Sequence, residues 1–298
     1  MLDTKKYLDS EQIPYIENYQ AAKLCSFRVG GEVAIAVFPK TRDQFASAVD
    51  FLTREGKRHV ILGRGSNVVL PDGSYNGAVL LTQDMSAVRI SGTTVFAEAG
   101  ATLFSLARSA EVASLSGLEF AHGIPGSVGG GVYMNAGAYG GELSDRLVSC
   151  ECYDAQRGQF LTLKNGECGF SYRDSIFQKR KELKILSAEF LLERGDRNEI
   201  RAKMNELKAA RAEKQPLEYP SAGSTFKRPE GHFAGKLIED CGLKGVSVGG
   251  AAVSEKHAGF VINKGGATSA DIAALVKLIK DTVLERYGVL LECEIEFI

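Results

Sequence analysis

Two glycine-rich segments are the first candidates for chemistry in this chain. Residues 63–67 read Gly-Arg-Gly-Ser-Asn after a strand-like stretch, and the second segment, residues 117–141, is densest in glycine at 123–131. Glycine allows the backbone to approach a ligand closely, and consecutive N–H groups in a tight loop form a nest for an anion. Two such nests suit a pyrophosphate joined to a flat ring system, so the segments predict a bound dinucleotide.

Residues 63–67 do not complete the usual dinucleotide fingerprint, because Val68 takes the place of a third glycine. Alone, this segment is more typical of a tight turn after a strand. The composition of the second segment also occurs in flexible linkers. A linker, however, has no need of the apolar residues within the second segment, which are Ile124, Pro125, Val132, Tyr133 and Met134. The pattern favours an ordered functional loop.

Composition limits the classes of protein. A length of 298 residues predicts two or three domains, and 44% hydrophobic with 24% charged residues is typical of a globular protein. The net charge of −1 shows no excess of positive charge of the kind that binds nucleic acid or an anionic membrane. The six cysteines form no CxxC pair, which predicts reduced thiols and no metal site. We expect no signal peptide, anchor or membrane span.

The elements that would position the glycine segments follow from apolar periodicity. The expected β-α-β unit has strands at 33–38, 59–62 and 77–81, and a helix from Thr41 to about Gly56. A second block has a hairpin at 88–90 and 94–97, a helix at 102–112, and strands at 147–154, 159–163 and 183–193. The third has helices at 198–214 and 268–287 and a strand at 289–298. Together they predict an α+β protein.

Several motifs, in order along almost the whole chain, resemble those of the UDP-N-acetylenolpyruvoylglucosamine reductase family. The first three are residues 61–67 (ILGRGSN), 123–127 (GIPGS) and 134–142 (MNAGAYGGE). The others are 170–175 (FSYRDS), 214–218 (KQPLE), 220–229 (PSAGSTFKRP), 234–240 (AGKLIED), 253–260 (VSEKHAGF) and 291–295 (LECEI). Their number and order make the resemblance specific, whereas each single motif is weak.

The resemblance implies a vanillyl-alcohol-oxidase-like fold that holds FAD non-covalently between subdomains 1–84 and 85–197. A substrate domain, residues 198–298, completes the shorter subtype of the family. The implied reaction is the NADPH-dependent reduction of UDP-N-acetylglucosamine enolpyruvate to UDP-N-acetylmuramate, a cytoplasmic step of peptidoglycan synthesis. The residues that it assigns to FAD are Arg28, Gly63, Arg64, Gly65, Ser66, Asn67, Gly123, Ile124, Pro125, Gly126, Ser127, Gly129, Gly130, Asn135, Gly137, Ala138 and Tyr139.

The resemblance also implies three catalytic residues. Ser224 matches the proton donor, Arg173 the cation near the developing enolate, and Glu294 a carboxylic acid. Without it, Ser224 is an ordinary turn residue and Arg173 a surface arginine. Glu292, Glu294 and Glu296 would share one face of a terminal strand, as on a solvated sheet. Expected substrate contacts are Tyr172, Lys227, Arg228, His257 and Asn263, although a surface loop explains His257 equally well.

Small departures and two alternatives remain. Gly131 stands where alanine is common in the family, and Cys25-Ser26 where a threonine pair is common. One alternative is a sugar or alcohol oxidase on the same flavin fold, often with covalent FAD. The other is a non-catalytic nucleotide-binding module, which leaves Arg173, Ser224 and Glu294 without a role.

Overall fold

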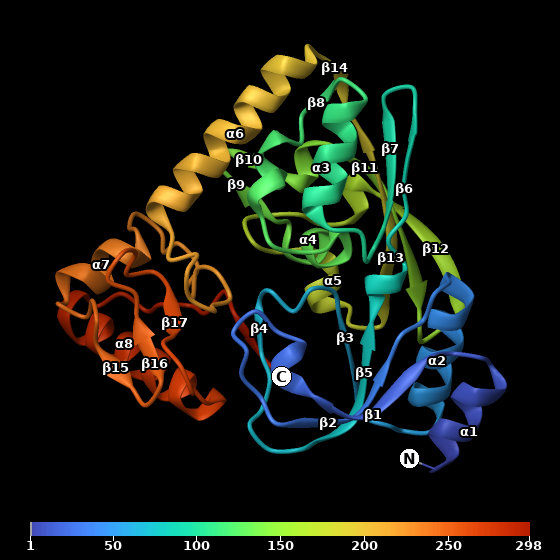
Figure 1. Cartoon of the computed structure of the whole chain (residues 1–298), viewed down its shortest axis with the longest axis horizontal. Helices are drawn as coiled ribbons and strands as arrows, with labels where there is room; N and C mark the ends of the chain where they lie inside the picture. The colour runs from blue at the N-terminus through green and yellow to red at the C-terminus, as the bar shows by residue number, and fades with distance from the viewer. Residues whose placement is uncertain (1) are drawn as a thin grey trace. The chain divides into compact units, whose positions relative to one another are not determined.

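The computed structural model describes residues 2–298, which form two compact units. Unit 1 comprises residues up to 17 together with 34–64 and 76–210, and unit 2 comprises residues 18–33, 65–75 and 211–298. Figure 1 shows the elements of both units along the chain. The α+β class is confirmed, while the division at residues 84 and 197 stays a prediction.

The first sheet has the order β1-β2-β5-β3, with β3 parallel to β5. Its strands are β1 (Tyr15–Gln20), β2 (Glu32–Val37), β5 (Tyr75–Leu81) and β3 (His59–Leu62). Helices α1 (Leu2–Ser10) and α2 (Arg42–Arg54) contribute Leu8, Phe45 and Leu52 to a core shared with Ile35 and Leu80. As predicted, α2 begins after Thr41, whose hydroxyl accepts a hydrogen bond from the Gln44 N–H.

The second sheet is antiparallel, with the order β12-β11-β13-β7-β6. Its strands are β12 (Gln159–Lys164), β11 (Leu147–Asp154), β13 (Leu183–Leu191), β7 (Thr94–Glu98) and β6 (Val88–Ser91). Helices α3 (Leu103–Val112) and α4 (Val128–Met134) share a hydrophobic core with it. The predicted hairpin and the helix at 102–112 are confirmed.

Helix α4 was not predicted, because glycine is a weak helix former and residues 128–134 contain several glycines. Ser127 caps the helix by accepting a hydrogen bond from the Gly130 N–H (3.2 Å), and Asn135 ends it in a left-handed conformation. A Cβ on Gly129 would lie 2.9 Å from the Ala99 Cβ, so only a residue without a side chain permits this approach. Close packing therefore offsets the low helix propensity.

Unit 2 contains the sheet β15-β16-β17 and helices α7 (Ala234–Asp240) and α8 (Ser269–Tyr287). The strands are β15 (Ser247–Val248), β16 (Ala251–Val253) and β17 (Val261–Asn263). The predicted helix at 268–287 is confirmed as α8, which begins with a capping box of Thr268 and Asp271 and ends at Gly288 in the left-handed region. The short strands of unit 2 that lie outside this sheet are β4 (Val68–Val69) and β18 (Glu296–Phe297). Unit 1 has the further short elements β8 (Leu115–Ser116), β9 (Gly137–Ala138), β10 (Gly141–Glu142), α5 (Ile176–Lys179) and β14 (Glu193–Arg194).

The predicted terminal strand at 289–298 is wrong for most of its length. Only β18 is a strand, paired with β4, and Cys293 forms an isolated bridge with Phe226. The chain bends at residues 294–295 because its two halves pair with different segments. The three glutamates therefore do not line one strand face: Glu292 is exposed, whereas Glu294 and Glu296 are partly buried.

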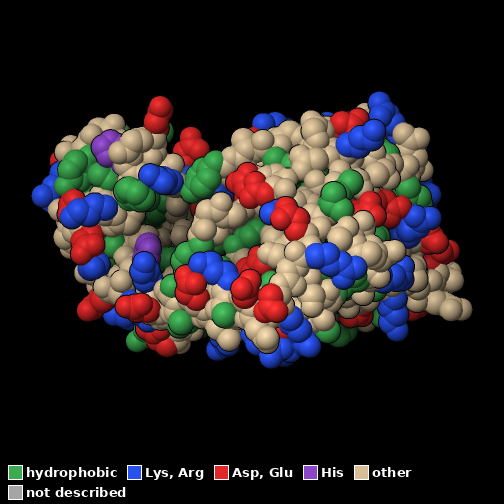
Figure 2. All heavy atoms as spheres, turned by 90° about the horizontal axis from the view of Figure 1, so that it is seen from above, with side chains coloured by type: hydrophobic (Ala, Val, Ile, Leu, Met, Phe, Trp, Pro, Cys, Tyr) green, Lys and Arg blue, Asp and Glu red, His purple; other side chains and the backbone are tan. Residues whose placement is uncertain are grey.

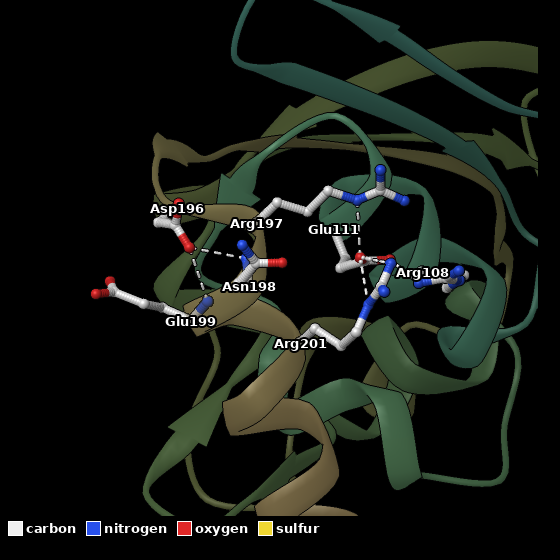
Figure 3. Close-up of polar contacts among 7 residues, drawn as sticks. All are labelled: Arg108, Glu111, Asp196, Arg197, Asn198, Glu199 and Arg201. Atoms are coloured by element: carbon white, nitrogen blue, oxygen red, sulfur yellow. Dashed lines mark hydrogen bonds and ion pairs between the residues drawn. The ribbon is translucent and has the colours of Figure 1, made fainter.

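A buried carboxylate fastens α6 (Arg197–Lys214) to α3 (Figure 3). Glu111 is fully buried and pairs with Arg108, Arg197 (3.0 Å) and Arg201 (2.8 Å). Helix α6 buries only Ile200 and Met204 among its residues, so apolar contacts alone hold it weakly. These four charged residues, here called the Glu111 cluster, attach α6 to α3 through ion pairs.

Among residues 2–298, no helix is long and apolar enough to cross a membrane. Figure 2 shows Lys and Arg side chains interspersed with Asp and Glu over the face that it draws, in keeping with the net charge of −1.

Candidate active site

The two glycine segments meet within unit 1, at Gly63 and Ser127. A Cβ on Gly63 would lie 1.9 Å from the Ser127 Oγ, closer than any real contact. Ser127 is buried and cannot turn away without giving up the cap of α4. The two glycine segments thus pack directly against each other at Gly63 and Ser127. Two glycine-rich loops in contact suit a dinucleotide, whose pyrophosphate needs close backbone approach.

Within α4, the glycines supply space rather than hydrogen-bond donors. The Gly129 N–H donates to the Ala99 carbonyl (2.8 Å), and the Gly130 N–H donates to the Ser127 Oγ. Both amides are satisfied by the protein, so the predicted nest does not include them as donors. Their contribution to a cofactor site would be the absence of a side chain.

We expect Gly63→Ala to weaken FAD retention by up to about 100-fold, because overpacking typically costs about 1–3 kcal/mol. The added methyl would force the two glycine segments apart. The measurement is the ratio of flavin to protein after dialysis, together with titration of the apoprotein with FAD. Gly166→Ala is the control, since a Cβ there meets no atom within 4 Å. Equal FAD affinity in both variants would contradict the prediction.

The first glycine segment continues into unit 2, where it packs on residues 24–28. Gly65 is left-handed (φ 59°), its carbonyl accepts the Ser26 N–H (2.9 Å), and a Cβ on it would lie 1.8 Å from the Leu24 carbonyl oxygen. Arg28 is also left-handed (φ 56°). The structure thus brings together Arg28 and Gly65, two of the predicted FAD residues, in one tightly packed loop pair.

Arg173 lies at the corner of a tight turn in unit 1. Ser171 and Asp174 close the turn through two backbone hydrogen bonds of 3.2 Å, and Arg173 has a φ of 53°. Its Nη2 donates to the Gly137 carbonyl (2.8 Å), which directs the guanidinium to the second glycine segment. The structure therefore places the predicted cation beside the predicted FAD loop. Tyr172, half exposed, has its ring 5.2 Å from that guanidinium.

Asn135 holds this arrangement from inside. Its side chain is fully buried, with Nδ2 donating to the Ser171 carbonyl and Oδ1 accepting the Ser144 N–H, both at 3.1 Å. The left-handed backbone of Asn135 is one that asparagine tolerates better than most residues. The amide that was predicted to contact FAD is thus engaged with the protein backbone.

Ser224 and Glu294 belong to paired segments of unit 2. Thr225, which follows Ser224 in the chain, is buried, and its carbonyl accepts the Glu294 N–H (2.8 Å). The Lys227 N–H donates to the Glu292 carbonyl (2.9 Å), so residues 225–227 run beside 292–294. The backbone that follows the predicted proton donor is therefore paired with the backbone of the predicted carboxylic acid, although the two are far apart in sequence.

Two further bonds fix this pairing, and the sequence contained no signal for either. The Asn67 Nδ2 donates to the Glu294 carbonyl (2.9 Å), which ties the first glycine segment to the acid. The Thr225 Oγ1 accepts the Val261 N–H (3.0 Å). The side-chain amide of Asn67, one of the predicted FAD residues, is thus hydrogen-bonded to the backbone of the predicted acid.

The predicted substrate residues in unit 2 differ in their surroundings. Asn263 is buried. Its Nδ2 donates a hydrogen bond to the Phe27 carbonyl (2.9 Å) and its Oδ1 accepts one from the Gly265 N–H (2.9 Å), which indicates a structural role. The Lys227 Nζ lies 3.8 Å from the Glu292 carboxylate, and the Arg228 guanidinium lies 4.0 Å from the Phe233 ring centre. The substrate contacts themselves stay a prediction.

His257 is held as a neutral ring. Burial lowers its pKa below the ordinary value of 6.5, and its Nδ1 accepts the Gly259 N–H (3.1 Å), which an imidazolium cannot do. The stabilisation is present above pH 6.5 and is lost as the pH falls through the lowered pKa. We expect an NMR titration to give a pKa below 6.5 for this ring, with faster exchange of the Gly259 amide on protonation. A pKa at or above 6.5 would contradict this.

The two departures from the family pattern have local explanations. A Cβ on Gly131 would lie 2.7 Å from the Leu143 Cδ1, so an alanine there requires that buried leucine to move. The Cys25 Sγ donates to the Val29 carbonyl (3.3 Å), a bond of the kind a threonine hydroxyl makes. Burial raises the pKa of this thiol, so it stays protonated.

Comparison with known proteins agrees with this geometry. An FAD binding domain matches residues 33–164, and the UDP-N-acetylenolpyruvoylglucosamine reductase C-terminal domain matches residues 215–298. Fold and site thus define a flavin-dependent oxidoreductase. The reductase of Caldicellulosiruptor bescii is 44% identical over 100% of this chain and 95% of its own length. That of Caldanaerobacter subterraneus is 48% identical over 92% and 90%.

The crystal structure of the reductase from Thermus caldophilus superposes with a TM-score of 0.80 at 32% identity, covering 96% of this chain and 98% of that one. The chain belongs to the UDP-N-acetylenolpyruvoylglucosamine reductase family.

Proposed function

We propose that this protein reduces UDP-N-acetylglucosamine enolpyruvate to UDP-N-acetylmuramate with NADPH, in the cytoplasm, as a step of peptidoglycan synthesis. Bound FAD supplies hydride transfer from NADPH to the enolpyruvyl double bond. The observation that carries the proposal is the pairing of residues 225–227 with 292–294, supported by the family membership. This pairing brings the backbone that follows Ser224 beside the backbone of Glu294, the two residues that we propose supply a proton to carbon and assist its transfer.

The residues of unit 1 that would hold FAD surround the Gly63–Ser127 contact. They include residues 123–127 and the segment 135–139, in which the Gly137 carbonyl accepts a hydrogen bond from the Arg173 guanidinium. Gly65, Ser66 and Arg28 of unit 2 are the further proposed contacts. The glycine-rich backbone of residues 63–67 and 123–127 suits the pyrophosphate, and Ile124 and Tyr139 suit a flat ring.

The chemistry of the substrate is assigned to three side chains. Negative charge develops on the carbon that bears the carboxylate, and Arg173, permanently cationic, stabilises it. Ser224 supplies the proton to that carbon. Glu294 provides a carboxyl that orients the substrate and assists the proton transfer. Lys227 and Arg228 are the proposed partners of the diphosphate, and Tyr172 and His257 are further proposed substrate contacts.

The test is anaerobic and separates two half-reactions. Addition of NADPH to the holoenzyme should bleach the flavin absorbance, which is the reductive half-reaction. Subsequent addition of UDP-N-acetylglucosamine enolpyruvate should restore the colour, which is the oxidative half-reaction. A flavin that bleaches but does not recover with this substrate would contradict the substrate assignment.

The alternative oxidase and the non-catalytic module have their own tests. Acid precipitation should leave the supernatant yellow, because the family binds FAD non-covalently; flavin in the pellet would favour an oxidase. A colourless protein that takes up no FAD would favour the binding module.

A further inference from the structure

Arg173 is held in a backbone conformation that a non-glycine residue disfavours. Its φ of 53° lies in the left-handed region, where the Cβ of an L-residue crowds the neighbouring carbonyl. Strained residues of this kind persist only where the surroundings determine them firmly, and they gather at functional sites. The groups that hold the backbone of Arg173 therefore decide where its guanidinium lies.

Gln178 of α5 is one such group. Its Nε2 donates to the Arg173 carbonyl (3.0 Å) and to the Tyr133 carbonyl (3.1 Å). One amide NH₂ carries two hydrogens, so it can make both bonds at once. The Ser175 Oγ also donates to the Tyr133 carbonyl (2.7 Å), which strengthens the attachment of α5 to α4.

These bonds connect both ends of Arg173 to the second glycine segment. Gln178 ties its carbonyl to Tyr133, near the end of α4, while the guanidinium donates to Gly137, just beyond that end. A shift of the turn would thus displace the cation relative to the loop assigned to FAD.

We propose that Gln178 is a positioning residue, whose side-chain amide sets the place of the Arg173 guanidinium for the step in which substrate charge develops. The inference rests on the proposed function of Arg173. Gln178 acts through Arg173, so its loss should slow the oxidative half-reaction selectively and leave the reductive half-reaction unchanged.

The test compares Gln178→Met, which keeps length but loses both donors, with Gln159→Met, an exposed glutamine on β12. The oxidative half-reaction of Gln178→Met should slow about 10- to 100-fold, the range expected for a misplaced catalytic group. NADPH reduction, FAD affinity and the unfolding temperature should stay near wild type, and Gln159→Met should match wild type throughout.

Gln178→Glu supplies an independent readout, because its carboxylate lacks donors but its protonated form carries one. Its defect in the oxidative half-reaction, relative to wild type at each pH, should shrink as the pH falls. The defect of Gln178→Met should not. In an Arg173→Lys background, Gln178→Met should cause little further loss, since both changes act on one cation.

Unaltered half-reactions in Gln178→Met, or equal losses in both half-reactions, would overturn the inference. Parallel loss of FAD affinity would also overturn it, by assigning Gln178 to the general structure. Failure of the wild-type flavin to recover with the enolpyruvyl substrate would instead overturn the proposed function, so the two failures are distinguishable.

Discussion

Replacing Ser224 by alanine is expected to slow the oxidative half-reaction by about 100- to 10,000-fold, the range that a positioned general acid contributes. The substrate carbanion would lose its proton source, whereas NADPH reduction requires no proton from Ser224. Stopped-flow absorbance of the flavin, measured separately with NADPH and with the enolpyruvyl sugar, checks both halves in one preparation.

The matched control for this prediction is Ser247→Ala, which removes an exposed hydroxyl on β15 of the same unit. It should behave as wild type in both half-reactions. Equal slowing of the two half-reactions in Ser224→Ala would show that the serine supports the structure rather than the proton transfer.

Replacing Glu111 by alanine is expected to lower the free energy of unfolding by about 2–4 kcal/mol. The buried carboxylate neutralises Arg108, Arg197 and Arg201, and its removal leaves three cations to repel one another around a cavity. The arginine side chains are close to half exposed and can turn toward water, which keeps the cost below that of a fully buried unpaired charge. Urea unfolding monitored by circular dichroism measures the change.

Two variants test the cause. Glu206→Ala removes an exposed glutamate of α6 that pairs with Lys203, and it should cost less than about 1 kcal/mol. Glu111→Gln keeps the volume and should fall between the two. If Glu111→Ala were as stable as Glu206→Ala, the Glu111 cluster would not be what fastens α6 to α3.

The sequence determined the elements whose signals are local. Thr41 and Thr268 are side-chain caps that act on the N–H groups of the following turn, so the beginnings of α2 and α8 were predictable. The hairpin of β6 and β7 follows from alternation over a short loop. Clustered glycine likewise marked the segments that form the candidate cofactor site.

Helix α4 was not predicted and the terminal strand was predicted wrongly, because both depend on contacts between residues that are distant in sequence. Helix α4 forms from glycines because Ala99, Leu103 and Leu143 pack against it, and none of these is adjacent in sequence. The terminal strand breaks at Glu294 because its neighbours pair with two different segments. In both cases a contact between distant residues overrides the local propensity.

What this sequence determined alone was therefore a set of capped helices, short strands and two glycine segments, with a family resemblance that named the chemistry. Only the tertiary structure decided that Gly63 lies against Ser127, that Gln178 and Gly137 hold Arg173, and that the Thr225 carbonyl accepts the Glu294 N–H. The physical reason is that caps and periodicity act within a few residues. The positions of reacting groups depend instead on hydrogen bonds and packing between segments that meet only once the chain has folded.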